Sequence, residues 1–352
     1  MAVYLVMLTI SIFFASLAGR IRGIQEYKRT FCVCAVLSFV PFLVVSAIRY
    51  EVGTDWIVYD AFFTRINEGT EYFKEPLFNL LNKLLYLFTQ DSQWIFVVSA
   101  VLSLSFTFLA IYKQSMYIPF SILLFFLSTV YFNSLNQVRQ AIAMSIFLFA
   151  SQYIWKRDWK KYLLWILLAT GMHLSALIYV PIYFIYGWKA EIKKHLLLFA
   201  AVAVSMPVIK VVLIKVISLT PYAWYFDSMH TGNDFMLSSF IMSLLLLLLY
   251  EYYNYIGNRE DDKQFHFMVN MQWPCVVSTL CTSFIPQFSS ISGAFEIMII
   301  LSIPKMILYE KNRNQRIIVY CLVVALLAVE LIYNVYICGF YDVIPYETIF
   351  SR

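Results

Sequence analysis

A few charged residues lie at the ends or breaks of long apolar runs in this chain, and they are the candidates for chemistry. Arg49 follows the apolar run 31–48, and Arg139 begins another. A guanidinium group presents a planar fork of N–H donors that suits an anionic ligand. His173 is a candidate general base. Asp55 and Glu75 are the acids of interest between these runs.

Arg139 lies at the start of an apolar run with amide side chains around it. Asn136, Gln137 and Gln140 are its near neighbours. A single terminal arginine is more often an anchor that reaches the lipid headgroups. The start of a helix, however, adds a positive dipole end and N–H groups without intrahelical partners. The cluster therefore favours an anion site over a simple anchor.

His173 lies at the break of an apolar stretch, beside Gly171. A lone histidine in apolar surroundings is commonly a hydrogen-bonded packing residue, but an ionisable group within a membrane favours function. General base and structural residue stay equal alternatives. Gly171 would let the chain turn or let a ligand approach. We expect His195 and His266 to be solvated beside basic loops, and His230 is a weaker candidate.

Three residues are weaker candidates for substrate binding. Glu75 precedes Pro76 and is therefore held at the entrance of a short apolar helix. Lys210 and Lys215 lie towards one end of an apolar run. From there their long side chains reach phosphate groups, either of bulk lipid or of a bound substrate.

The composition defines the class of protein that must position these residues. Of the 352 residues, 61% are hydrophobic and 13% are charged, whereas soluble chains keep about 25% charged. Apolar runs near span length recur throughout, which predicts an all-α, polytopic membrane protein with one domain over residues 1–352. The ten expected spans are about 2–18, 31–48, 94–112, 116–133, 138–155, 196–217, 236–256, 267–285, 291–309 and 317–338.

The charge and the cysteines exclude two classes of function. The basic residues lie in loops that flank membrane spans, so the net charge of +5 does not predict nucleic-acid binding. The six cysteines lie in or beside apolar runs and lack the spacing of a metal site. We expect no metal and no cofactor.

The loop charges predict the topology. Lysines and arginines gather in 20–29, 156–161, 189–194, 259–263 and 305–316, which are therefore cytoplasmic. Acids gather in 49–75, so 49–93 is expected to be an outer loop that includes an interfacial or re-entrant helix over 76–89. The stretch 161–188 is then a hairpin that starts and ends inside, although a single tilted span is the alternative.

Taken in order, several segments resemble the EpsG family, the Wzy-like polymerases of bacterial polysaccharide export. The resemblance extends over most of the chain, and the motifs together are more specific than any one of them. The matching segments are Arg49 to Asp55, Glu75 to Phe78, Leu80 to Lys83, Val138 to Ala143, Met172 to Leu177, and Pro345-Tyr346.

One segment departs from the family pattern. A basic residue is expected before the late aromatic-rich span, but the segment from Phe288 to Ile297 has none. The anion site therefore lacks one member, or Lys210 or Lys215 supplies it.

The resemblance implies a glycosyltransferase of GT-C-like architecture. It would join undecaprenyl-diphosphate-linked oligosaccharide repeat units in O-antigen, capsule or exopolysaccharide biosynthesis. Arg49, Arg139 and Gln140 would bind the diphosphate, and His173, or as second choice Asp55, would be the general base. The resemblance also implies the bacterial cytoplasmic membrane, with the active face outside or periplasmic. The expected partners are lipid-linked oligosaccharide, membrane lipids and a chain-length regulator.

Two other functions are alternatives. A flippase or exporter of the same lipid-linked sugars would carry charged residues along a central path through the bilayer, whereas here they are mostly on the outer side. A membrane acyltransferase that modifies polysaccharide would also need a membrane histidine. It would have no evident need for two outer arginines.

Overall fold

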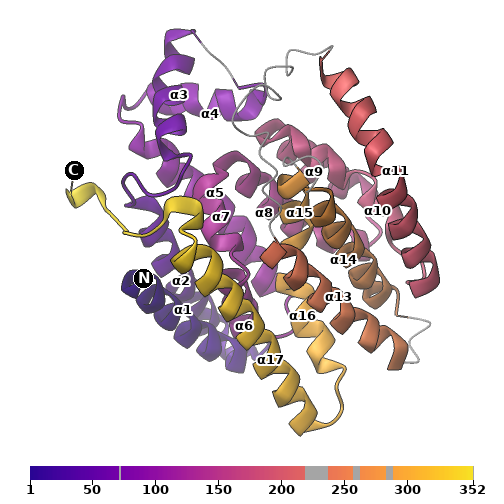
Figure 1. The fold of residues 1–352 in the computed structure, drawn as a ribbon. Helices are drawn as coiled ribbons and strands as arrows, with labels where there is room; N and C mark the ends of the chain where they lie inside the picture. The colour runs from indigo at the N-terminus through magenta and orange to yellow at the C-terminus, as the bar shows by residue number, and fades with distance from the viewer. Residues whose placement is uncertain (71–72, 219–236, 257–261, 283–287, 352) are drawn as a thin grey trace. The chain divides into compact units, whose positions relative to one another are not determined.

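The structure is a computed structural model that describes residues 1–70, 73–218, 237–256, 262–282 and 288–351 (Figure 1). These described residues form 16 α-helices, together with short turns, 3₁₀ segments and one π-helical segment, Ile332–Ile337. Six helices are long and apolar enough to cross a membrane, or seven if one bent pair counts as a span. The chain is therefore an all-α, polytopic membrane protein, as the composition predicts.

These candidate membrane-spanning helices, with the bent pair counted as one span, coincide with seven of the ten expected spans. The bent pair has an angle of 55° between its halves, and the break falls at Thr129, whose φ is 62°. The helices are α1 (Ala2–Ile21), α2 (Lys28–Ala47), α5 (Gln93–Gln114), α11 (Ile192–Ser218), α13 (Leu237–Ile256), α17 (Arg313–Leu331), and the pair α6 (Ile118–Leu127) and α7 (Val130–Asn136).

The other three expected spans differ from simple membrane helices. Helices α8 (Val138–Trp155) and α14 (Lys263–Cys281) form, but they carry polar side chains that are buried within the protein. The third is divided into α15 (Phe288–Glu296) and α16 (Ile299–Leu308). The count of ten expected spans thus exceeds the six or seven candidates, because some apolar helices bury their polar groups against other helices.

The chain forms two compact units, 1–183 with 299–352 and 184–298. In the first unit, α8 packs against α5 and α9 (Trp159–Met172), while α1 packs against α2 and α6. In the second unit, α14 packs against α11, α13 and α15, around Leu247, Trp273 and Val276. The expectation of a single domain stays a prediction.

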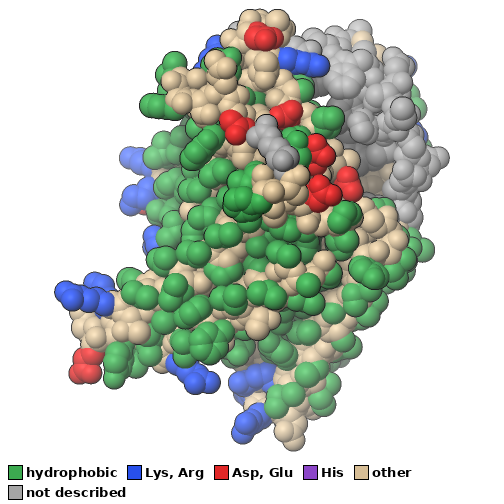
Figure 2. Space-filling view, turned by 90° about the vertical axis from the view of Figure 1, so that its left-hand side faces the viewer, with side chains coloured by type: hydrophobic (Ala, Val, Ile, Leu, Met, Phe, Trp, Pro, Cys, Tyr) green, Lys and Arg blue, Asp and Glu red, His purple; other side chains and the backbone are tan. Residues whose placement is uncertain are grey.

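Loops with basic residues gather at one end of the first unit. The Arg22 guanidinium donates to the carbonyl oxygens of Ser115, at 2.6 Å, and Lys113, at 3.3 Å. Arg316 and Tyr117 line one groove. We call this the basic end. In Figure 2, hydrophobic side chains cover the middle of the visible face, and most of the visible acidic side chains lie in its upper half.

The acidic segment 49–75 is more regular than expected, since it contains the helix α3 (Trp56–Glu68). Trp56, Tyr59, Phe63 and Ile66 are its buried residues, and their spacing of three and four places them on one face. The expected short helix is α4 (Pro76–Tyr86), which packs against α3, α5 and α9.

The chain reverses direction at His173. Helix α9 ends there, with His173 in an extended conformation, and a 3₁₀ segment, η2 (Leu174–Tyr179), follows. The Tyr162 hydroxyl donates to the carbonyl oxygen of Tyr179 at 2.6 Å. A straight helix would hold these residues about 25 Å apart. The fold-back expected within 161–188 is therefore present, and its re-entry into the membrane stays a prediction.

Candidate functional site

Glu75 links two of the candidate residues. Its Oε2 atom accepts a hydrogen bond from an Arg139 terminal nitrogen at 2.7 Å, and its Oε1 atom lies 3.1 Å from Nδ1 of His173. The carboxylate side chain is 6% exposed, whereas those of Arg139 and His173 are 23% and 22% exposed. A buried acid thus joins two more accessible groups from different helices. We call Glu75, Arg139 and His173 the polar triad.

Close packing of α4 on α9 brings Glu75 to His173. A Cβ atom added at Gly171 would lie 2.5 Å from the end of the Leu77 side chain. Glycine therefore lets the two helices approach. Glu75 lies two residues before Leu77, and His173 two residues after Gly171. The expected role of Gly171 in a turn or at a ligand stays a prediction.

Glu75 is ionised in this setting. Burial opposes its ionisation, but the hydrogen bond from His173 and the positive charge of Arg139 outweigh burial and lower the pKa of Glu75 to about 2. An ionised carboxylate only accepts hydrogen bonds, so Nδ1 of His173 carries the proton. Within the described part of the chain, Nε2 of His173 makes no hydrogen bond. In neutral His173, Nε2 is then the basic nitrogen.

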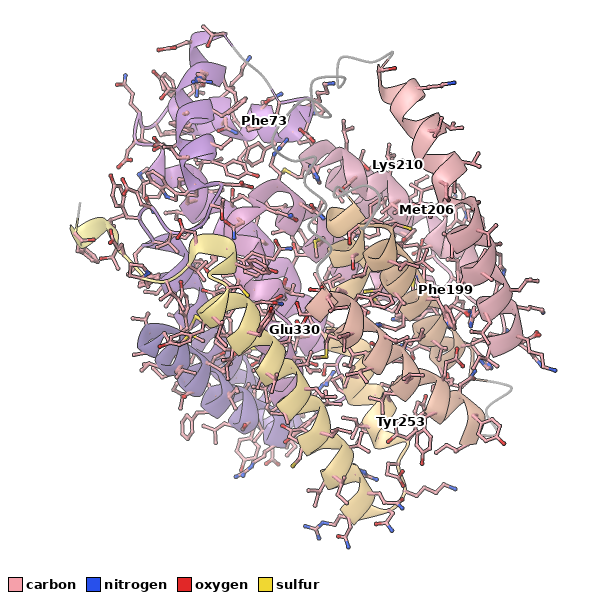
Figure 3. All side chains as sticks on the ribbon, in the orientation of Figure 1. Phe73, Phe199, Met206, Lys210, Tyr253 and Glu330 are labelled. Atoms are coloured by element: carbon pink, nitrogen blue, oxygen red, sulfur yellow. The ribbon has the colours of Figure 1, made fainter. Side chains whose placement is uncertain are left out.

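Aromatic rings enclose Arg139. Its guanidinium carbon lies 4.0 Å from the centre of the Phe73 ring and 5.9 Å from that of Tyr59; Phe73 is labelled in Figure 3. The backbone N–H of Arg139 donates to the Tyr59 hydroxyl at 3.5 Å, so one of the N–H groups expected for an anion has a partner. The buried Nε of Arg139 has none among the described residues. This geometry leaves donor capacity for an anion.

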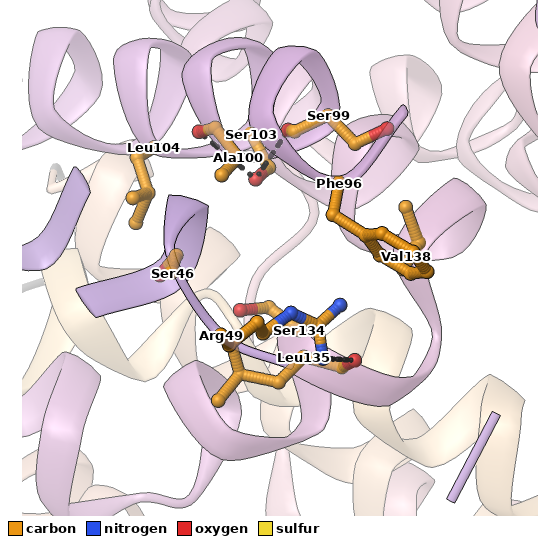
Figure 4. Close-up of a pocket in the computed structure, with 10 residues that line it drawn as sticks. All are labelled: Ser46, Arg49, Phe96, Ser99, Ala100, Ser103, Leu104, Ser134, Leu135 and Val138. Atoms are coloured by element: carbon orange, nitrogen blue, oxygen red, sulfur yellow. Dashed lines mark hydrogen bonds between the residues drawn. The ribbon is translucent and has the colours of Figure 1, made fainter. Parts of the chain in front are cut away.

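Arg49 is held differently, by backbone carbonyl groups. One terminal nitrogen donates to the carbonyl oxygens of Val52 and Leu135, and its guanidinium lies 5.0 Å from the centre of the Phe96 ring (Figure 4). The whole residue is 3% exposed. The cavity beside it has about 10 Å³, enough for about one water molecule and far below the roughly 300–1,000 Å³ of ligand pockets.

The loop after Arg49 binds the C-terminal segment. The Tyr50 N–H donates to the Glu347 carbonyl at 3.1 Å, and the Gly53 N–H to the Asp342 carbonyl at 2.8 Å. Gly53 has a φ of 107°, and a Cβ atom there would lie 2.9 Å from a terminal nitrogen of Arg49. Only glycine fits this backbone and this close approach. Arg49 thus lies in a structural junction.

Asp55 and Gln140 are close in sequence to these two arginines. Asp55 precedes α3, and its N–H donates to the Asn136 side chain at 3.4 Å. Gln140 is 4% exposed within α8. On a helix, consecutive residues point in different directions. Their predicted roles, second-choice base and diphosphate ligand, stay predictions.

The remaining candidates belong to the second unit. Lys210 and Lys215 lie on α11, along which Figure 3 labels Lys210, Met206 and Phe199. Their predicted contact with the substrate stays a prediction. His230 lies outside the described residues.

The prediction that His195 and His266 are solvated is wrong. His266 is 8% exposed, and its Nδ1 accepts a hydrogen bond from the Ala190 N–H at 3.3 Å. The His195 ring lies 3.3 Å from Oε1 of Glu251 and 2.8 Å from Oδ1 of Asn270. Both histidines are close in sequence to lysines, but the His195 ring packs against residues of α13 and α14, and the His266 ring is buried beside Ala190. The partners of each ring are more than fifty residues away in the chain, so no local sequence pattern reveals them.

Among the described residues, no group of three or more His, Cys, Asp or Glu side chains is placed to hold a metal ion. The fold and the site define the class: a multi-pass, all-α membrane protein with a charged cluster at the end of the first unit opposite to the basic end.

The comparison with protein families gives a more particular assignment. The EpsG family model matches residues 32–348, which is most of the chain. The chain therefore belongs to the EpsG family, which is linked to exopolysaccharide biosynthesis, and the resemblance seen in the sequence motifs is confirmed. Searches of curated proteins and of solved structures found no match.

Proposed function

We propose that this protein is a polysaccharide polymerase. It would join oligosaccharide repeat units carried on undecaprenyl diphosphate, at the outer face of the bacterial cytoplasmic membrane. Membership of the EpsG family supports the biosynthetic setting. The polar triad supports the reaction, because it combines an anion-binding group with a basic nitrogen.

The proposed step is a glycosyl transfer. A hydroxyl oxygen of the acceptor sugar attacks the anomeric carbon of the donor, and the bond from that carbon to the diphosphate oxygen breaks. Nε2 of His173 takes the hydroxyl proton. The departing lipid diphosphate keeps the bonding electrons and gains negative charge, which Arg139 stabilises.

The observation that carries this proposal is the shared carboxylate of Glu75. By accepting from Nδ1 of His173 at 3.1 Å, it fixes the tautomer that leaves Nε2 available as a base. By accepting from Arg139 at 2.7 Å, it fixes the guanidinium beside the same ring. In this proposal Glu75 is a positioning residue, and its predicted role as a weaker ligand of the substrate stays a prediction.

The structure supports the predicted roles of the other residues to different degrees. Arg49 as a second diphosphate ligand stays a prediction, and its burial favours a structural role. Asp55 stays the second candidate base. The amphipathic helix α4 and the reversed segment after α9 would shape the outer entrance for the polyprenyl tails. The contact of Lys210 or Lys215 with the substrate stays a prediction.

Deletion of the gene, followed by sizing of the surface glycan, tests the function. A polymerase predicts loss of the ladder of long chains while a single repeat unit still reaches the surface. Loss of all surface glycan would instead indicate a flippase or exporter. An unchanged ladder with a changed acyl content would indicate an acyltransferase.

A further inference from the structure

An apolar groove between α2 and α5 has no part in the site described above. Its volume is about 480 Å³, within the roughly 300–1,000 Å³ that ligand pockets occupy. The residues that line it are Phe31, Cys32, Ala35, Val36, Phe39, Ser105, Phe108, Leu109, Tyr112 and Lys113.

The groove lies away from the polar triad, at the basic end of the first unit. Helices α2 and α5 are antiparallel, because the Gln93 side chain at the start of α5 donates to the Ala47 carbonyl, at the end of α2, at 2.7 Å. The groove is lined by the first part of α2 and the last part of α5. The substrate diphosphate, if Arg139 holds it, is at the other end of these helices.

Two aromatic pairs form the walls, with small side chains between them. Phe31 packs on Tyr112 with ring centres 5.8 Å apart, and Phe39 packs on Phe108 at 5.5 Å. Ala35 is the small residue of α2 between these pairs. The Tyr112 hydroxyl already has a partner, Ser38, at 2.6 Å. The walls thus offer apolar surface, which suits a hydrocarbon chain.

Cationic side chains surround the basic end of the groove. Lys113 lines it and is exposed, and the Arg22 guanidinium lies 3.3 Å from the Lys113 carbonyl oxygen. Lys28 and Arg29, both exposed, begin α2 just before Phe31. The loop 20–29 contains a single acid, Glu26, against four basic residues (Arg20, Arg22, Lys28 and Arg29). A ligand with an apolar chain and an anionic head complements this arrangement.

We propose that the groove binds one acyl chain of an anionic glycerophospholipid whose phosphate lies against Lys113. The apolar walls take the chain, and the cations select the charge of the head. The substrate lipid is a poorer match, since its diphosphate belongs at the end of the unit that carries Arg139. The bound phospholipid would fix α2 against α5 and so support the loop that begins at Arg49.

Native mass spectrometry of the purified full-length protein tests this. The probes are phosphatidylglycerol and phosphatidylcholine with identical acyl chains, and undecaprenyl phosphate as a third lipid. We expect one phosphatidylglycerol to be retained in preference to the other two. Lys113→Gln should reduce the preference over phosphatidylcholine about fivefold, the contribution of one cation near an anionic head. Ala35→Trp, which fills the groove, should lose the retained lipid.

A matched control is Leu322→Trp, which adds the same ring at an exposed apolar position of α17, outside the groove. It should retain phosphatidylglycerol as the wild type does. Equal retention of the two phospholipids, stronger retention of undecaprenyl phosphate, or an unchanged preference in Lys113→Gln would each overturn the proposal. Lys113→Gln changes one exposed side chain, so the test does not depend on whether Ala35→Trp folds.

Discussion

Arg49 and Arg139 begin as similar residues in the sequence and have opposite surroundings in the structure. Arg49 follows one apolar run and Arg139 begins another, and both lie at the same end of the first unit. Arg49 is 3% exposed and donates to backbone carbonyl groups, whereas the Arg139 side chain is 23% exposed and pairs with Glu75. The Arg49 guanidinium lies over the Phe96 ring and that of Arg139 over the Tyr59 ring, and the two ring centres are 6.5 Å apart.

This difference distinguishes an arginine held by backbone carbonyl groups from one that keeps donor capacity. Carbonyl partners are part of the fold, so a ligand can displace them only by breaking the junction with the C-terminal segment. The partner of Arg139 is a carboxylate, which shows that this guanidinium binds an anionic group. Arg139 also keeps a buried Nε without a partner among the described residues. We therefore expect changes at Arg49 to lower stability and changes at the polar triad to lower activity.

The largest expected effect is on activity, at Arg139 and His173. Arg139→Ala removes charge stabilisation of the leaving diphosphate and should lower chain extension by about 10²–10³-fold. His173→Ala removes the base, with a loss of about 10²–10⁴-fold. The measurement is the length distribution of surface glycan at matched protein level. Arg65→Ala, on an exposed position of α3, is the control, and long chains made by Arg139→Ala would refute the anion site.

Glu75→Gln should have a smaller effect on the rate. The amide keeps the size of the side chain but can donate to His173, which destabilises the tautomer with a basic Nε2. We expect a decrease of about tenfold to a hundredfold, in line with the loss of a supporting partner of a histidine. Measured with purified lipid-linked repeat units, the decrease should fall on the turnover rate. A change in substrate affinity alone would contradict a positioning role.

Arg49→Met should act on stability. It leaves the carbonyl groups of Val52 and Leu135 buried without a donor, at a cost of about 1–3 kcal/mol each. Thermal unfolding in detergent should show a lower midpoint and less folded protein. The control Arg65→Ala should unfold as the wild type does. A wild-type midpoint for Arg49→Met would show that the junction does not depend on this guanidinium.

The smallest effect concerns acid stability. The pKa of Glu75 in the folded chain is about 2, below the ordinary 4.5, because His173 and Arg139 outweigh its burial. Ionised Glu75 therefore stabilises the fold above pH 4.5, and that contribution is lost as the pH falls towards 2. The difference in unfolding midpoint between the wild type and Glu75→Gln should shrink over this window. Glu68→Gln, on an exposed position of α3, is the matched control.

Much of the fold was predictable from the sequence, since apolar runs specify helices and loop charges specify which ends lie together. The break at His173 was visible as a short apolar stretch interrupted by Gly171. Helix α3 was missed, although the spacing of Trp56, Tyr59, Phe63 and Ile66 indicates an amphipathic helix.

The contacts of the site were not predictable in the same way. Arg139 and His173 were both identified, but Glu75 meets them across 64 and 98 residues of chain, and no local pattern encodes such a contact. The burial of Arg49 depends likewise on the C-terminal segment, which lies about 300 residues further along the chain. A single sequence shows which charged residues lie at apolar runs, where burial is unfavourable. Only the packing shows which groups donate or accept the hydrogen bonds that offset that burial.

The most direct test compares Arg49→Lys with Arg139→Lys, by measuring long glycan made per folded molecule. Lysine keeps the charge in both variants but loses the planar fork. The two-arginine account predicts that Arg139→Lys folds normally and makes little polymer per molecule. It predicts that Arg49→Lys yields less folded protein, and that those molecules polymerise at close to the wild-type rate. A normally folded Arg49→Lys that makes no polymer would contradict it and make Arg49 a diphosphate ligand.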